Sequence, residues 1–166
     1  MSCRTQARSI SDETDDGDRL HASLRQANRT DIPGIQRVRH AVKENRLTSR
    51  AISDDEVAHA IEVSGRGWVV EVDSTIVGFA IGNAQDGNIW ALFIDPEHEG
   101  HGHGRLLHDS IVAWLWSRGL RKFWLSTEPG TRAQRFYSSA GWTDRGLLPS
   151  GELRFELHRP DGSTDA

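Results

Sequence analysis

The chain is poor in cysteine and in long apolar runs. Cys3 is the only cysteine among 166 residues, which excludes an intramolecular disulfide framework and a cysteine-based metal site. No stretch resembles a signal peptide, and the unbroken apolar runs are far too short to span a bilayer. These absences predict a soluble, cytoplasmic protein without a membrane partner.

Charge is distributed unevenly along the chain. Residues 1–18 hold five acidic residues and two arginines, and so contribute −3 to the formal net charge of −4. This segment has little apolar surface to bury, which predicts a disordered acidic tail. The rest of the chain is close to neutral and lacks the basic footprint of a nucleic-acid-binding protein. We expect one folded domain over residues 19–159 and a polar tail over residues 160–166.

The hydrophobic pattern predicts alternating strands and helices, with a tight hairpin turn at Asp73-Ser74. Strands are expected at residues 20–26, 68–72, 76–82, 89–94, 123–127 and 153–157, with one more near Trp142. We expect Asp31, with Pro33 in the first turn, to begin one helix, and a capping box of Ser53 and Glu56 to begin the next. The buried stripes of the four helices are predicted to be Ile35, Val38 and Val42; Val57, Ala60 and Ile61; Leu107, Ile111, Trp114 and Leu115; and Ala133, Phe136, Tyr137 and Ala140.

A glycine-rich loop joins the strand at residues 89–94 to the helix that carries Leu107. Its sequence is Glu99-Gly100-His101-Gly102-His103-Gly104. A strand, a glycine loop and a helix in this order direct several backbone N–H groups at one anion, and the helix dipole adds to the attraction. Glycine lets a phosphate approach those N–H groups closely. The loop therefore predicts a site for a phosphate-bearing cofactor.

Other readings of the loop fit less well. A Walker loop ends in Gly-Lys-Ser/Thr, whereas Gly104 is followed here by Arg105 and Leu106. A dinucleotide fingerprint has the spacing G-x-G-x-x-G, and this loop has G-x-G-x-G. Four nearby histidines raise a zinc hypothesis, but no His-Glu-x-x-His pattern accompanies them, so we expect no metal. They are His98, His101, His103 and His108.

The loop resembles the acyl-CoA loop of the GNAT acetyltransferase superfamily, written Gln/Arg-x-x-Gly-x-Gly/Ala. A second block, from Thr131 to Trp142, resembles that family's Asn-x-x-Ala-x-x-Phe/Leu-Tyr-x-x-x-Gly-Phe motif. The resemblance implies an α+β, layered α/β/α fold, in which helices cover both faces of a mixed, mostly antiparallel sheet. It also implies acetyl-CoA as the cofactor, bound by Leu92, Phe93, Ile94, Glu99, Gly100, His101, Gly102, His103, Gly104, Arg105 and Gly130.

Two of these positions depart from the family pattern. Glu99 stands where the family prefers Gln or Arg, and a carboxylate beside a pyrophosphate is unfavourable. We expect its side chain to turn to solvent and its backbone N–H to serve the phosphate. Gly130 stands where the family often has Asn. The strand at residues 89–94 is expected to splay from the next strand, with a backbone N–H of Leu92 or Phe93 facing the thioester oxygen.

Tyr137, the only tyrosine in the chain, is the predicted general acid. By resemblance, this residue lies near the sulfur and returns a proton to the departing thiolate. A phenol with a pKa of about 10 stays protonated at neutral pH and can serve in this way. Spacing alone allows another reading, in which Tyr137 only completes the apolar stripe of its helix.

The general base is not determined by the sequence. Glu44 is our first candidate, because the connector between the first two helices usually walls the acceptor site in this family; Glu71 and Asp86 are alternatives. Many relatives carry a Glu on the strand before the second motif, but Leu125 and Ser126 occupy that region here. Asn45 and Trp90 are expected to bind the acceptor.

The resemblance predicts an N-acetyltransferase that transfers an acetyl group directly to an amine of a small molecule, a peptide or a protein. The alternative is a non-catalytic acyl-CoA-binding regulatory module, which the unusual Glu99 and Gly130 favour. A dinucleotide oxidoreductase is a distant third. Because family members often dimerise, a homodimer is a further expectation.

Overall fold

The computed structural model describes residues 22–42 and 52–159. The predicted tails, and the candidates Glu44 and Asn45, lie outside these residues. In chain order the described elements are β1 (Ala22–Gln26), η1 (Arg29–Asp31), α3 (Ile32–Ala41), α4 (Asp54–Glu62), β2 (Gly65–Val72), β3 (Thr75–Asn83), β4 (Ile89–Ile94), η2 (Pro96–His98), α5 (His103–Ser117), β5 (Lys122–Thr127), α6 (Arg132–Ser139), β6 (Thr143–Leu147) and β7 (Leu153–His158). The predicted order is confirmed, including the additional strand after Trp142.

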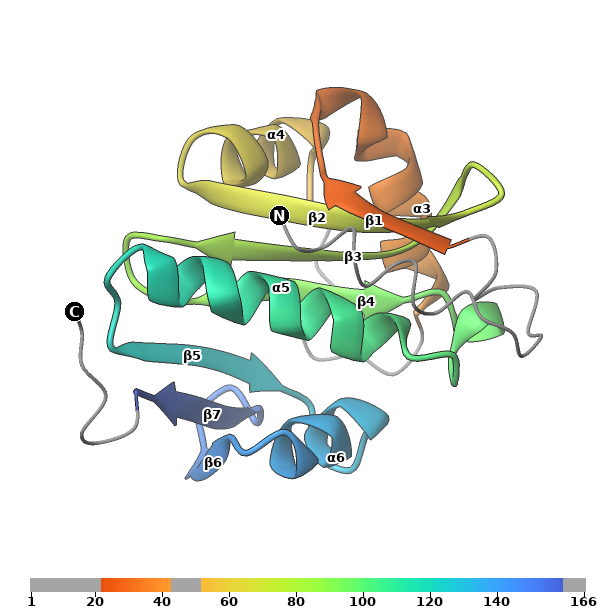
Figure 1. Ribbon diagram of the computed structural model, residues 1–166. Helices are drawn as coiled ribbons and strands as arrows, with labels where there is room; N and C mark the ends of the chain where they lie inside the picture. The colour runs from red at the N-terminus through yellow and green to blue at the C-terminus, as the bar shows by residue number, and fades with distance from the viewer. Residues whose placement is uncertain (1–21, 43–51, 160–166) are drawn as a thin grey trace.

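The strands form two antiparallel sheets. One has the order β1-β2-β3-β4 and the other the order β5-β7-β6. An isolated parallel bridge between Asn88 and Trp124 joins them, and the Trp124 N–H donates to the Gly87 carbonyl at 2.9 Å. Figure 1 shows β5 on the side of the second sheet that is nearer to the first, with β7 and β6 farther away.

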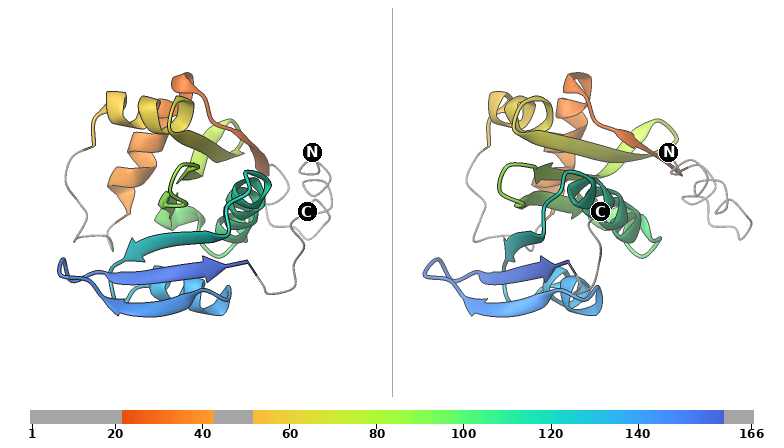
Figure 2. Two further views of the ribbon diagram at one scale, coloured as in Figure 1. Left: turned by 90° about the vertical axis from the view of Figure 1, so that its left-hand side faces the viewer. Right: turned by 60° about the vertical axis from the view of Figure 1, so that its left-hand side comes forward.

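Helices cover both faces of the first sheet. The helices α3 and α4 pack on one face through Ile35, Val38 and Val57, which are almost fully buried. The helix α5 packs on the other face and against the second sheet through Leu107, Ile111 and Leu115, all with no exposed surface. Figure 2 shows the layers edge-on. The predicted layered arrangement is therefore confirmed.

Local signals set several of the element ends. Ser53 and Glu56 form the predicted capping box at α4. At the hairpin between β2 and β3, Asp73 and Ser74 have φ values of 52° and 67°. Positive φ at both central residues is typical of a type I′ turn, whose twist matches that of the paired strands.

Asp31 stands at the predicted N-cap position of α3, with Pro33 in the first turn. Asp31 precedes α3, but its side chain makes no capping hydrogen bond there. Its carboxylate instead receives two bonds from the Arg25 guanidinium, at 2.8 and 2.9 Å, and one from the backbone N–H of Asn28. Asn28 caps the preceding 3-10 turn. The Asp31 side chain therefore forms a tertiary ion pair with Arg25 of β1 and does not cap α3.

Most residues predicted to form the buried stripes of the helices are buried, and the remaining ones are half-buried. Val42 lies just beyond the last residue of α3, and in α4 Ala58 is buried while Ala60 is only half-buried. Trp114 is also half-buried, because its ring lies against Trp68 and under the guanidinium of Arg66 at 5.1 Å.

Candidate active site

A cleft of about 980 Å³ opens where β4 and β5 part. Its walls include β4 from Asn88 to Ile94 and β5 from Trp124 to Thr127. Beyond the bridge at Asn88, no ladder joins β4 to β5 within the part of the chain that the structure describes. The backbone groups on this edge of β4 are therefore available to a bound molecule. The predicted splay between the two strands is confirmed.

A β-bulge in β4 contributes to the opening. Ile81 pairs with Ala91 and Gly82 pairs with Ile89, which leaves Trp90 without an opposite residue on β3. A bulge bends its strand and increases the local twist. Trp90 lies half-buried on the wall of the cleft, where the sequence placed it. Its role in acceptor binding stays a prediction.

The glycine loop closes one end of the cleft. Gly100 and Gly102 have φ values of 85° and 87°, a left-handed conformation that disfavours any residue with a Cβ atom. Gly102 is the N-cap of α5. The first bond of the helix that involves this cap runs from the Leu106 N–H to the Gly102 carbonyl, at 3.1 Å. In an α-helix the first N–H groups are not used by the helix itself and point out of its N-terminal end.

The end of α5 is suited to an anion. No acidic residue lies in its first turn. No carboxylate of that turn therefore competes with a bound anion for the positive end of the helix dipole. Gly104 lies in this turn with an ordinary backbone, and a Cβ atom built on it would come no closer than 3.8 Å to Ile94. Packing within the protein therefore does not require glycine at this position. A ligand that approaches the backbone closely would require it.

Most of the predicted cofactor residues line this cleft. They are Leu92, Phe93, Ile94, Glu99, Gly100, Gly102, His103, Gly104 and Arg105. His101 and Gly130 do not line it, although Thr131 and Arg132, next to Gly130, do. The Gly130 N–H donates to the side chain of Gln134 at 2.6 Å, so that backbone group is already used in the turn before α6.

The Glu99 side chain does not simply turn to solvent. Its carboxylate lies 3.4 Å from the guanidinium of Arg132, the first residue of α6, and the side chain is about one-third exposed (34%). An opposite charge at this distance offsets the repulsion expected between the carboxylate and a phosphate. The pair also links the glycine loop to α6 across the cleft.

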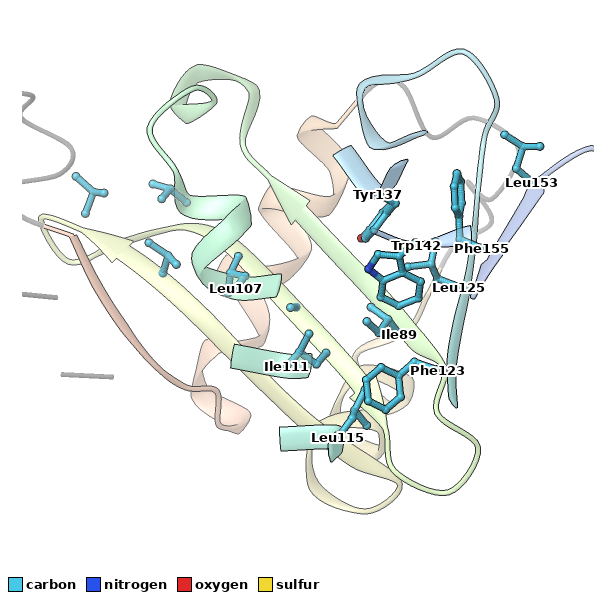
Figure 3. Packing of buried hydrophobic residues seen from close by; sticks show 14 residues of the cluster. Ile89, Leu107, Ile111, Leu115, Phe123, Leu125, Tyr137, Trp142, Leu153 and Phe155 are labelled. Atoms are coloured by element: carbon cyan, nitrogen blue, oxygen red, sulfur yellow. The ribbon is translucent and has the colours of Figure 1, made fainter. Parts of the chain in front are cut away.

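Tyr137 is buried within a group of aromatic rings. It is 5% exposed, and its ring contacts those of Phe136 and Trp142 edge-on. The residue lines the cleft, and in Figure 3 the oxygen end of the ring is turned toward β4. Burial raises the pKa of the Tyr137 phenol well above its usual value, so the phenol keeps its proton at neutral pH. Both readings of the sequence are compatible with this position: Tyr137 belongs to the core and also faces the cleft.

His108 supports this aromatic group from α5. Its Nε2 accepts a hydrogen bond from the Trp142 indole N–H at 3.0 Å, and its Nδ1 lies 2.9 Å from the Asp109 carboxylate. Burial lowers the pKa of His108, and Asp109 partly opposes this effect. The neutral ring thus donates through Nδ1 and accepts through Nε2. The sequence suggested only a metal ligand here, because the partner Trp142 is distant along the chain.

The two base candidates that the structure describes, Glu71 and Asp86, lie away from the cleft. Glu71 binds the Arg25 guanidinium at 3.1 and 3.3 Å, and Asp86 accepts from the Asn88 N–H within a turn. Neither residue lines the cleft. Ser126, which does line it, donates a hydrogen bond to Glu152 at 3.2 Å. Sequence reasoning missed Glu152, because only the pairing of β5 with β7 brings it to the site.

Among residues 22–42 and 52–159, no three His, Cys, Asp or Glu side chains are grouped as a metal ion would require. Within the same residues, every helix is too short or too polar to cross a membrane.

Comparison with known proteins gives a consistent result. A family model described as acetyltransferase (GNAT) family matches residues 33–142. A search of curated proteins found no match. One similar solved structure is that of yncA from Salmonella typhimurium with its cofactor acetyl-CoA, with a TM-score of 0.73, 18% identity, and coverage of 88% of this chain and 98% of that chain.

Two more solved structures are similar in fold. The PaiA N-acetyltransferase from Thermoplasma acidophilum, in complex with coenzyme A, has a TM-score of 0.70 and 15% identity, over 82% of this chain and 98% of that chain. The ribosomal-protein-S18-alanine N-acetyltransferase from Escherichia coli has a TM-score of 0.64 and 18% identity, over 86% and 96%. These likenesses confirm the predicted fold.

Proposed function

The chain belongs to the acetyltransferase (GNAT) family, and we propose that it transfers an acetyl group from acetyl-CoA directly to an amine of a small molecule, a peptide or a protein. The observation that carries this proposal is the glycine loop at the N-terminus of α5, which faces a cleft between two splayed strands. The solved structures of yncA and of PaiA contain acetyl-CoA and coenzyme A, respectively, in the same fold.

The residues of the cleft fit acetyl-CoA in type and order. The N–H groups of the loop and the first turn of α5 would hold the diphosphate. The free edge of β4, from Leu92 to Ile94, would bind the amide groups of the pantetheine arm through backbone hydrogen bonds. When bound, acetyl-CoA supplies an acyl group activated as a thioester.

The chain's own groups then serve the transfer. A backbone N–H of Leu92 or Phe93 would stabilise the negative charge that develops on the thioester oxygen, an effect of several kcal/mol in other enzymes. Tyr137, which keeps its proton at neutral pH, would donate it to the sulfur as the thiolate leaves. The apolar wall formed by Ile35, Val57 and Phe79 would exclude water from the acceptor side.

The most direct test is release of free thiol from acetyl-CoA. The panel of acceptors would contain amino acids, linear diamines and short peptides with free N-termini. We expect saturable release that depends on at least one of these amines. Saturable binding of coenzyme A without acceptor-dependent release would support the alternative, a non-catalytic acyl-CoA-binding module. The Glu99–Arg132 pair weakens one reason for that alternative, because it neutralises the unusual acid.

Two expectations from the sequence remain predictions. They are a cytoplasmic location and a homodimer. The second can be tested by measuring the molar mass of the full chain in solution.

A further inference from the structure

Ser126 and Glu152 form a hydrogen-bonded pair behind the cleft. Ser126 lies on β5 and lines the cleft, and its hydroxyl donates to Glu152 Oε1 at 3.2 Å. In the β5–β7 ladder, Ser126 pairs with Arg154 and Thr127 pairs with Leu153. Glu152 is therefore diagonal to Ser126 on the same face, where cross-strand side chains meet.

The carboxylate of Glu152 is unusual for a buried acid. The residue is 8% exposed, and its Oε2 is buried without a hydrogen-bond partner. Besides Ser126, its side chain contacts the Ser150 hydroxyl at 3.5 Å. No cation within 4 Å balances its charge in the described part of the chain. A buried carboxylate without a cation is costly to the fold.

Glu156, on β7, shows the usual arrangement of a partly buried acid. It pairs with Arg154 at 2.9 Å and with Arg145 and His158 at slightly longer distances. The sheet thus contains cations for a structural acid, but Glu152 receives none of them. Glu152 thus keeps one carboxylate oxygen without a partner, while its other oxygen accepts from the hydroxyl of a residue that lines the cleft. An unsatisfied buried group calls for an explanation, and a catalytic role is one that fits a residue bonded to the lining of the cleft.

We propose that Ser126 and Glu152 relay the proton that the acceptor amine must lose. This proposal rests on the proposed acetyl transfer. As the amine nitrogen bonds to the acetyl carbon and the carbon–sulfur bond breaks, Ser126 Oγ takes the proton of the nitrogen and passes its own proton to Glu152. Tyr137 gives its proton to the leaving sulfur. Glu152 then loses its proton to water, and Tyr137 regains one from water, which restores both residues.

In this relay, Ser126 touches the amine and Glu152 acts through it. Among the described residues that line the cleft, Glu99 at the phosphate end is the only acid. An acid that accepts the proton of the amine would therefore have to act through another residue. In the proposed relay, the carboxylate acts from the residue that directly precedes β7, through Ser126 of β5.

Three variants of the full chain test the relay. Ser126→Ala removes the hydroxyl, and Glu152→Gln keeps the shape and an acceptor oxygen but cannot take up a proton. Ser150→Ala is the matched control, because it removes the other contact of Glu152 and does not line the cleft. The probes are acetyl-CoA and the amine of the panel that gives the fastest thiol release. Calorimetric titration with coenzyme A measures cofactor binding, and circular dichroism measures folding.

We expect Ser126→Ala and Glu152→Gln each to lower kcat by about 10²-fold or more, with coenzyme A affinity and the KM for the amine changed less than about threefold. The double variant should be no slower than the slower single variant, because two residues that act as one unit are non-additive. Ser150→Ala should keep kcat within about twofold.

The outcomes separate the relay from the function on which it rests. If the wild-type chain releases thiol with no amine of the panel, the proposed transfer fails and the relay fails with it. If the wild-type chain is active but Glu152→Gln retains its kcat, only the relay is overturned. Loss of activity in Glu152→Gln together with equal loss of coenzyme A binding would also overturn the relay, since it would indicate a structural role.

Discussion

The indole N–H of Trp142 donates a 3.0 Å hydrogen bond to Nε2 of His108, deep between α5 and the second sheet. Figure 3 shows the Trp142 ring next to Tyr137, within the cluster that also holds Leu107 and Ile89. This bond needs a neutral imidazole, because a protonated ring has no acceptor at Nε2. Tyr137, the proposed general acid, packs against Trp142. The hydrogen bond that holds Trp142 to His108 therefore depends on pH.

Stability should fall as the solution becomes acidic. Burial lowers the pKa of His108 in the folded state below its ordinary value, so the unfolded chain binds the proton more tightly. The neutral His108 ring therefore contributes its full share of stability above the pKa of an unfolded histidine, about 6.5, and this share is lost as the pH falls below that value. We expect the free energy of unfolding, measured with denaturant, to decrease less between pH 7.5 and pH 5.5 for His108→Gln than for the wild-type chain. His40→Gln, on the exposed side of α3, is the control and should keep the wild-type fall. An equal fall in all three proteins would contradict this role.

Gly104 should show opposite effects on folding and on cofactor binding. Its backbone is helical, and a Cβ atom would find room 3.8 Å from Ile94, so Gly104→Ala should stabilise the fold by up to about 1 kcal/mol. The same methyl group would stand over the N–H groups of the α5 terminus and should weaken coenzyme A binding at least about tenfold. Thermal unfolding and calorimetry measure the two effects. Unchanged affinity would place the phosphates elsewhere.

Gly102→Ala provides the comparison. Because Gly102 has a φ of 87°, alanine at this position should cost about 1–2 kcal/mol of stability. A loss of binding in this variant would therefore include backbone distortion, whereas the loss in Gly104→Ala would not.

The Glu99–Arg132 pair should tune cofactor affinity and leave stability almost unchanged. Both side chains are partly exposed, and ion pairs of this kind contribute about 0–1 kcal/mol. Glu99→Gln removes a negative charge beside the phosphate site and should tighten coenzyme A binding about twofold to tenfold at low salt. Arg132→Gln should weaken it, since Glu99 then keeps its full charge. The two differences should shrink at high salt. If Glu99→Gln binds coenzyme A more weakly, the assigned position of the diphosphate is wrong.

Tyr137→Phe should separate chemistry from binding. The substitution keeps the ring that packs against Phe136 and Trp142 and removes only the proposed proton donor. We expect kcat for thiol release to fall tenfold or more, with coenzyme A affinity retained. Steady-state kinetics on the best amine of the panel provide the measurement. Full activity would remove the phenol from the mechanism.

The sequence was most informative where a local signal fixes the structure. β4 spans residues 89–94 as predicted, because an apolar run ends at Asp95 and glycines with special backbone angles follow. The capping box of α4 was found because both of its partners lie within one helical turn. Phosphate loops can be recognised for the same reason: their chemistry is carried by a few consecutive residues.

The sequence was less informative where partners are distant along the chain. Asp31 begins α3 as predicted, but its carboxylate binds Arg25 of β1, which no local pattern indicates. The bulge at Trp90 depends on the register with β3, which no local pattern gives. Glu152 meets Ser126 only through the pairing of β5 with β7. All three are tertiary effects, and the last one brings together two of the residues to which we assign proton transfer.

The central claim is that the loop from residue 99 to residue 105 binds the diphosphate of coenzyme A. Titration of coenzyme A into the full-length protein, followed by calorimetry, tests it most directly. We expect saturable heat for one site per chain, strongly reduced in Gly104→Ala although that variant is folded and at least as stable. The absence of heat from the folded wild-type protein, or undiminished binding by Gly104→Ala, would contradict it.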